Sequence, residues 1–310
     1  MPPFPPLFQI HSDLHLETPL ARPSYAYFSC PTNFPLHASN LFLLGDIGYV
    51  RDASLFTFLT ALLQRTPNLK IFYVLGNHEA YGVTLAYAKE RLRAFEREVR
   101  RDYGERFWFM DRRRVDLSPR VTVLGCTLWT SIPGEAARAC AARLTDFNIA
   151  RGIKDRVVDE HNADHVADLA WLNAQVGEIE REGESGEERE VVILTHHCPT
   201  VDERGADPRR GESEVRVGFA TDLSVEVCWR SRRVKMWAFG HTHDSCCFYD
   251  EEEGGKKLVI ANQKGYAGLG GQGEWVARTC VVEAGEEEWK EKRPSTRQHI
   301  SSRGKQEEES

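Results

Sequence analysis

Residues 71–79 read Ile-Phe-Tyr-Val-Leu-Gly-Asn-His-Glu, so an apolar run stops abruptly at a glycine and three polar residues. An apolar run of this length without alternation is typical of a strand that is covered on both faces. Four similar runs lie at residues 7–10, 41–44, 191–194 and 234–239. Because such strands need a layer on each side, the sequence predicts helices packed over sheets.

Apolar residues also recur at the spacing of one helix face. They mark three segments: Leu55, Phe58, Leu59 and Leu62; Leu85, Leu92, Phe95 and Val99; and Val166, Leu169 and Leu172, the last set facing inward from a helix expected over about residues 159–179. Thr84 is the expected N-cap of the second helix. Since strands and helices alternate along the chain, the predicted fold class is α/β.

Two segments have the composition of exposed chain. Residues 178–190 are rich in Glu, Gly and Arg, and we expect an exposed connection between a helix and a buried strand there. After residue 284 the chain is charged, and Trp289 and Ile300 are its only large apolar residues. The sequence therefore predicts one domain over residues 1–284 and a charged, disordered C-terminal tail over residues 285–310.

Composition excludes several classes of protein. The 310 residues are 41% hydrophobic and 28% charged, which is enough to build a sizeable core. No apolar stretch approaches the roughly 18 residues of a membrane-spanning helix. The net charge of −7 opposes a large nucleic-acid surface or attraction to anionic lipid. Arg112-Arg113-Arg114 is the local exception, and a solvated face or turn is its expected setting.

The cysteines and the N-terminus bear on the compartment. None of the eight cysteines forms a C-x-x-C pair, so reduced thiols are expected. Residues 1–6 are proline-rich and lack the apolar core of a signal peptide. These features predict a cytoplasmic protein, with the nucleus as the alternative location.

Polar residues with catalytic potential follow each apolar run. They are Asp13-Leu14-His15, Gly45-Asp46, Gly76-Asn77-His78-Glu79, His196-His197 and Gly240-His241-Thr242-His243. Each group alone is also typical of a turn or of a buried, hydrogen-bonded imidazole. In α/β sheets, however, ligands bind beyond the carboxyl ends of the strands, and five such ends deliver these side chains to one crevice.

The ordered set D-x-H, G-D, G-N-H-E, H-H and G-H-T-H resembles the calcineurin-like metallophosphoesterase superfamily. The resemblance extends from Leu7 to about Gly265. Further segments resemble small, single-domain and largely uncharacterised members: Thr127-Leu128-Trp129-Thr130, Asp146-Phe147-Asn148, Phe219-Ala220-Thr221-Asp222-Leu223 and Asn262-x-x-Gly265-Tyr266. Many relatives carry a second acid three residues after Asp46, whereas this chain has Tyr49 there.

The resemblance implies a fold and a metal centre. The fold is two mixed β-sheets packed as a sandwich and flanked by helices, in four layers α/β/β/α. Two divalent ions are implied, one held by Asp13, His15 and His243 and the other by Asn77, His196 and His241, with Asp46 bridging them. The resemblance favours His196 over its neighbour His197, and residue type alone allows either. Imidazole, carboxylate and amide ligands without thiolate suit Mn, Fe or Zn.

The resemblance also implies an activity. Two divalent ions and two carboxylates leave a net charge of +2, which favours an anionic substrate. A phosphate monoester or diester of a small molecule would be hydrolysed by in-line attack of a metal-bridging hydroxide. His78, which is not needed as a ligand, would assist the leaving group.

Two other interpretations compete with this one. A catalytically silent scaffold of the same fold would be expected to have lost at least one ligand, and every expected ligand is present. A metallo-β-lactamase-like hydrolase needs an H-x-H-x-D-H cluster, which His241-Thr242-His243-Asp244-Ser245 does not supply. Trp129, Asp146, Asn148 and His161 are candidates for the rim of the pocket. For Trp129 a core position and for His161 a helix-surface position are equally compatible with the sequence.

Overall fold

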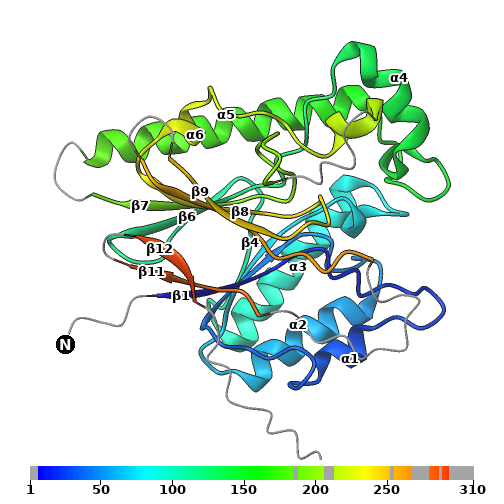
Figure 1. The fold of residues 1–310 in the computed structure, drawn as a ribbon. Coiled ribbons are helices and arrows are strands. Elements are labelled where there is room, and N and C mark those ends of the chain that lie inside the picture. Colours follow the sequence, from blue (N-terminus) through cyan, green and yellow to red (C-terminus); the bar gives the residue numbers. More distant parts are fainter. Residues whose placement is uncertain are drawn as a thin grey trace, which may run out of the picture.

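The computed structural model describes residues 6–183, 188–205, 213–251, 255–266, 279–285 and 288–292. Two six-stranded sheets lie face to face, and helices cover the outer face of each (Figure 1). The strand orders are β12-β11-β1-β2-β3-β4 and β5-β6-β7-β8-β10-β9. Both sheets contain parallel and antiparallel pairs, so the predicted four-layer α/β/β/α fold is confirmed.

The bounds of the elements are as follows. The first sheet contains β1 (Leu7–His11), β2 (Asn40–Leu44), β3 (Lys70–Val74), β4 (Phe107–Phe109), β11 (Val281–Ala284) and β12 (Trp289–Lys292). The second contains β5 (Arg113–Asp116), β6 (Val121–Gly125), β7 (Glu190–Leu194), β8 (Val234–Phe239), β9 (Cys246–Asp250) and β10 (Lys257–Ala261). The helices are α1 (Tyr25–Ser29), α2 (Ala53–Arg65), α3 (Leu85–Tyr103), α4 (Gly134–Arg143), α5 (Val158–Gly183) and α6 (Val227–Arg230), with short 3₁₀ turns η1 (His78–Ala80), η2 (Thr145–Phe147) and η4 (Glu214–Gly218).

Alternate residues of each buried strand face two different apolar layers. On β2, Phe42 and Leu44 point into the layer between the sheets, whereas Leu41 and Leu43 pack against the helices outside. On β7, Val192 faces the other sheet in the same way. Because both faces are covered, apolar residues point to both sides of these strands, and within the five runs only Gln9 and Lys235 are polar.

The predicted strands and helices are found, with two corrections in α5. Val166 is 64% exposed, so its predicted inward position is wrong. The buried face of the first half of α5 is polar: His165 hydrogen-bonds the Trp129 carbonyl, and Asp168 accepts from Arg112 and from the Leu128 amide. The helix also continues to Gly183, and the exposed connection predicted from residue 178 is therefore shorter than expected.

The predicted tail boundary at residue 285 is also wrong. Strand β12 pairs antiparallel with β11, and Trp289 is 3% exposed because its ring stacks on Phe8 at 5.3 Å between the sheets. One large aromatic residue together with a strand ladder is enough to order this segment. Residues 286, 287 and 293–310 of the predicted tail lie outside the described residues.

Two smaller expectations concern the cysteines and membranes. All eight cysteines lie in the described part of the chain, and no disulfide joins them. Among the described helices, none has both the length and the apolar character needed to cross a membrane.

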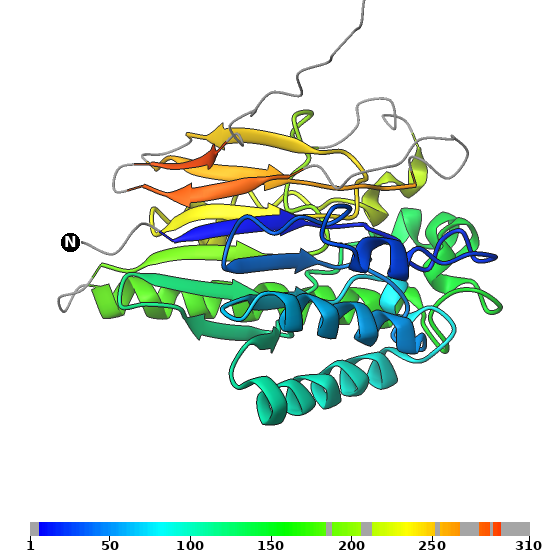
Figure 2. The ribbon, with the colours of Figure 1, turned by 90° about the horizontal axis from the view of Figure 1, so that it is seen from below.

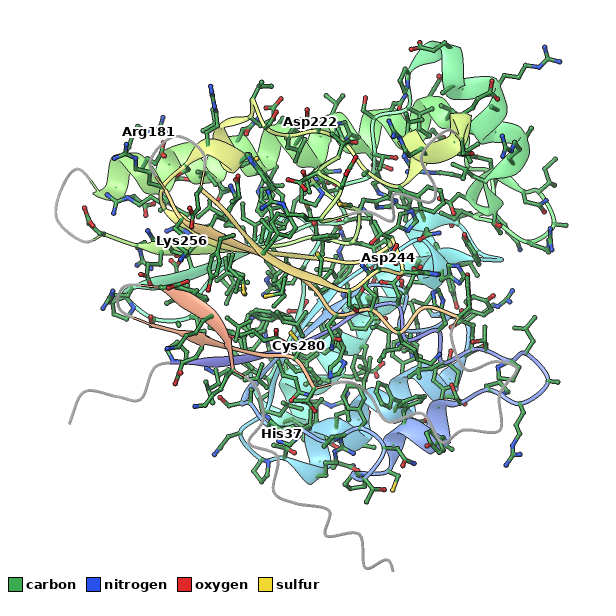
Figure 3. All side chains as sticks on the ribbon, in the orientation of Figure 1. His37, Arg181, Asp222, Asp244, Lys256 and Cys280 are labelled. Carbon is green, nitrogen blue, oxygen red and sulfur yellow. The ribbon has the colours of Figure 1, made fainter. Side chains whose placement is uncertain are left out.

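The carboxyl ends of the five predicted strands lie at one end of the molecule. Strands β1, β2 and β3 are parallel neighbours in one sheet, and β7 and β8 are parallel neighbours in the other. Figures 1 and 2 both place the loop after β1 and the loop that precedes α5 at this same end. The polar groups that follow the strands therefore meet across the edge where the two sheets come together.

Candidate metal centre

The seven side chains expected to hold metal ions lie together at this edge. Their ligating atoms form two groups within 4.8 Å, one of Asp13, His15, Asp46 and His243 and the other of Asp46, His196 and His241. Asn77 joins the second group, because its Oδ1 lies 3.0 Å from His196 Nε2. Asp46 belongs to both groups, which is the division expected for a bridging carboxylate.

In the second group, the lone pairs of His196, His241 and Asp46 face one another with no proton between them. His196 Nδ1 lies 2.8 Å from the Leu44 carbonyl and His241 Nε2 lies 3.2 Å from the Gly218 carbonyl. A carbonyl can only accept, so each of these nitrogens carries the proton and the opposite nitrogen carries the lone pair. The two lone-pair nitrogens, His196 Nε2 and His241 Nδ1, are 3.2 Å apart, and Asp46 Oδ1 is 3.5 Å from His196 Nε2.

The side-chain oxygen of Asn77 is also directed at the lone-pair nitrogen of His196. Its Nδ2 donates to Asp146 Oδ1 and to the Tyr81 hydroxyl, both at 2.8 Å, so its oxygen turns to His196. Burial lowers the pKa of His196 and of His241, and both imidazoles are neutral at pH 7. These lone pairs repel one another unless a cation lies among them.

The first group is built in the same way. His15 Nε2 lies 3.0 Å from His243 Nε2 and 4.0 Å from a carboxylate oxygen of both Asp13 and Asp46. His15 Nδ1 faces Glu17 Oε1 at 3.3 Å, and because a carboxylate accepts, the proton lies on Nδ1 and the lone pair on Nε2. Burial lowers the pKa of His15 to about 4.

The buried carboxylates of the site need positive charge. Burial and the negative charges of Glu79 and Asp13 raise the pKa of Asp46 well above its usual range. Burial would also raise the pKa of Asp13, but its contacts with His243, His196 and His15 hold that pKa below the ordinary value. A divalent cation between the two carboxylates would offset their repulsion.

Five of the seven expected ligands have a left-handed backbone. The φ angles are 52° for Asp13, 46° for His15, 54° for Asp46, 69° for His241 and 58° for His243. Only eight non-glycine residues have a positive φ in the part of the chain that the structure describes. Such residues each cost on the order of 1–3 kcal/mol and cluster where function requires a particular side-chain direction. The tight turns aim these side chains back across the strand ends.

Glu79 holds two of the turns together from beneath. Its buried carboxylate accepts four hydrogen bonds, from the amides of Asp46, Ile47 and Gly76 at 2.8–2.9 Å and from the Tyr73 hydroxyl at 2.8 Å. Gly76 is needed at this place because a Cβ there would lie 2.3 Å from Asp46 Oδ1. Glu79 thus fixes the backbone that carries Asp46, the candidate bridging residue, through amides and not through the Asp46 carboxylate.

Replacing Glu79 by glutamine is expected to lower the free energy of unfolding by about 3 kcal/mol. The amide group of glutamine would point two donors at the donors Ile47 N–H and Tyr73 O–H, so at least one buried donor loses its acceptor. Denaturant unfolding of the metal-free protein measures the change. Glu98→Gln, an exposed position on α3 with one ion pair to Arg91, is the matched control. Equal stability of the two variants would contradict this role of Glu79.

His78 lies beside both groups and is open to solvent at one side. Its Nδ1 is 3.0 Å from Glu17 Oε1, and its Nε2 is 4.0 Å from Asp46 Oδ2. The Tyr266 hydroxyl lies 3.0 Å from the same Nε2, and the Tyr266 ring stacks on His15 at 4.4 Å. The His78 side chain is 12% exposed, whereas those of His15 and Glu17 beside it are fully buried.

The other candidates have different settings. His197 is buried on Trp129 and on His241, and neither of its ring nitrogens has a hydrogen-bond partner within the described residues. Trp129 is a core residue, and His161 is buried on the inner face of α5 and not on the helix surface. Asn148 accepts from the amides of Ala150 and Arg151 in a turn.

Sequence reasoning assigned no role to four residues that support the site. They are Glu17, Glu79, Tyr81 and Tyr266. Glu79 and Tyr266 stand in motifs quoted above, and Glu17 lies only two residues after His15.

Comparison with known proteins agrees with this geometry. The family model described as calcineurin-like phosphoesterase matches residues 12–245. The chain is 25% identical over 271 residues to the uncharacterized protein L509 of Acanthamoeba polyphaga mimivirus, which covers 83% of this chain and 90% of that protein.

Two solved structures are similar in fold. The phosphopantetheinyl hydrolase PptH from Mycobacterium tuberculosis has a TM-score of 0.58 at 15% identity, over 94% of this chain and 97% of that one. A dimetal phosphatase from Danio rerio has a TM-score of 0.53 at 14% identity, over 91% of this chain and 94% of that one.

Proposed function

The chain belongs to the calcineurin-like phosphoesterase family, and we propose that it is a dinuclear metal-dependent hydrolase of phosphate esters. One observation carries this proposal. Two groups of electron-pair donors converge, share Asp46, and have their protons turned outward by carbonyl and carboxylate acceptors. That arrangement is favourable only when cations occupy both groups.

The donor set fits two divalent ions. Asp13, His15 and His243 would hold one, Asn77, His196 and His241 the other, and Asp46 both. Nitrogen and oxygen donors without thiolate suit Mn, Fe or Zn. When bound, the ions would neutralise the phosphoryl oxygens and lower the pKa of a water molecule that serves as the nucleophile.

The side chains around the ions have separate tasks. The His78 amide donates to Asp46 Oδ1 at 2.8 Å and fixes the bridging carboxylate. Glu17 accepts from His78 Nδ1, which leaves Nε2 as the nitrogen that faces the substrate. We infer that protonated His78 donates its Nε2 proton to the departing oxygen of the ester. The Tyr266 hydroxyl holds that nitrogen in place before substrate binds.

A catalytically silent scaffold is the alternative for this fold. It requires no metal ligands, and it gives no reason for the hydrogen bonds that orient them. Here every ligand position is occupied by a ligating side chain, and Leu44, Gly218, Glu17 and Asp146 each hold one of these side chains in the orientation for binding. These contacts favour the enzyme.

The proposed activity is tested with the metal-reconstituted protein on paired aryl phosphate monoesters and diesters. We expect release of the aryl alcohol from one class or both, loss of activity with a chelator, and recovery with Mn²⁺ or Zn²⁺. Asp46→Asn serves as the negative control. Protein that holds two ions but hydrolyses neither class would contradict the proposal and support the scaffold.

A further inference from the structure

Three basic side chains near the site have no acidic partner. Arg51, Arg151 and Lys154 are exposed, and within the described residues none of their side chains forms an ion pair or a hydrogen bond. The arginines of the 112–114 run differ, because Arg112 donates to Asp168 at 2.7 Å and Arg114 donates to Glu182 at 2.9 Å. In an acidic protein, basic side chains without partners are candidates for binding an anion.

The backbone brings these three residues together. The Gly82 amide donates to the Gly152 carbonyl at 2.8 Å, and the Lys154 amide donates to the Val83 carbonyl at 2.9 Å. Residues 151–154 therefore run beside residues 81–83. The Arg51 guanidinium lies directly against Gly82, since a Cβ on this glycine would lie 2.0 Å from Arg51 Nη1. We call Arg51, Arg151 and Lys154 the cation patch.

Arg51 is held in place by an aromatic ring. Its Cζ lies 4.5 Å from the centroid of the Tyr49 ring, so the guanidinium is positioned while its hydrogen-bond donors stay available. On a second side of the guanidinium lies Gly82, which has a φ of +79° and leaves space for Arg51 because it lacks a Cβ. A cation that is fixed and unpaired loses little entropy when it binds an anion.

The cation patch borders the leaving-group side of the site. The Tyr49 ring stacks over the His78 ring at 6.3 Å, and the Tyr81 ring, next to Gly82, lies 4.3 Å from it. His78 is the residue assigned above to the departing oxygen. A substrate whose departing group extends past His78 therefore reaches Tyr49 and then Arg51.

We propose that the departing group of the substrate carries a second anionic group, a phosphate or a carboxylate, which the cation patch binds. The inference rests on the proposed function, because the departing group is the part of the ester that lies on the His78 side of the site. A guanidinium binds such a group through two parallel N–H bonds, and the two neighbouring cations add charge. Asp155 follows Lys154 but forms no ion pair with it within the described residues.

The test compares two esters that differ only in the departing group. Phenyl phosphate lacks a second anion, and 4-(phosphonomethyl)phenyl phosphate carries one that cannot be hydrolysed; the corresponding methyl diesters are used if the protein is a diesterase. Release of phosphate or methyl phosphate is measured for both. We expect kcat/KM to be higher for the second ester, and Arg51→Gln to lower the ratio of the two values about tenfold.

Two further variants sharpen the test. The triple variant R51Q/R151Q/K154Q is expected to remove the preference for the second anion altogether. Arg232→Gln changes an exposed arginine just before β8, at the other end of that strand from the site, and the ratio should stay as in the natural protein. An unchanged ratio in the triple variant, or an equal loss in Arg232→Gln, would overturn the inference.

Binding is measured separately from turnover. Calorimetry with the metal-loaded protein should show tighter binding of 1,4-phenylenebis(methylphosphonate) than of benzylphosphonate, and Arg51→Gln should reduce the difference about tenfold. If the natural protein hydrolyses no ester, the proposed function fails, and this titration still decides whether the cation patch binds a second anion. Equal affinities for the two anions in the natural protein would contradict it.

Discussion

Replacing Asp46 by asparagine is expected to lower hydrolysis by about 10³-fold or more and to reduce the bound metal from two ions to one or none. One carboxylate oxygen of Asp46 faces His196 at 3.5 Å and the other faces His15 at 4.0 Å, so each oxygen serves one of the two groups. Asparagine keeps the shape but offers only one oxygen, and its amide nitrogen does not ligate. One ion loses its bridge and both lose negative charge.

Metal content by mass spectrometry and steady-state kinetics on the same sample measure this effect. Asp102→Asn, on an exposed aspartate of α3 that pairs with Arg101, controls for the loss of a carboxylate elsewhere. Two ions per chain in Asp46→Asn, with activity within tenfold of the natural protein, would show that Asp46 does not bridge.

Replacing His78 by alanine is expected to lower kcat about 10²–10⁴-fold while both ions stay bound. His78 donates only its backbone amide to Asp46, and alanine retains that amide. What is lost is the ring whose Nε2 lies 4.0 Å from Asp46 Oδ2 and whose Nδ1 is held by Glu17. The defect should therefore be catalytic and not a failure to bind metal.

The way the His78→Ala defect depends on the departing group distinguishes a proton donor from a structural residue. A series of aryl esters with graded phenol pKa is hydrolysed by both proteins. The His78→Ala defect should be largest for poor leaving groups and small for nitrophenols, which depart without a proton. Equal loss of metal and turnover would instead make His78 a ligand or a structural residue.

The five strands that the sequence predicted are all buried on both faces, although β6 and β10 are buried as completely and were not predicted. Strands such as β2 need apolar residues at every position, and this leaves a clear signal. The edge strands do not: β4 has three residues, β5 includes Arg113 and Arg114, and β9 is only half-buried. Their pairing partners, and not their composition, make them strands. For the same reason Trp289 was assigned to a tail although it completes the layer between the sheets.

The clustering of the candidate metal ligands was predictable because each follows a strand whose end could be located. Their division into two groups around Asp46 required the spatial arrangement. The supporting contacts also needed it, since Tyr266 reaches His78 across 188 residues of sequence and Asp146 reaches Asn77 across 69. Arg51 gave no signal as a functional residue, because only the fold places Gly82 beneath its guanidinium.

Anomalous X-ray scattering from crystals grown with Mn²⁺ tests the central claim most directly. Two anomalous peaks are predicted, one beside His15 and His243 and the other beside His196 and His241, with the Asp46 carboxylate between them. No peak in this position, or a single peak that contacts only one of the two groups, would contradict the account of a shared two-ion site.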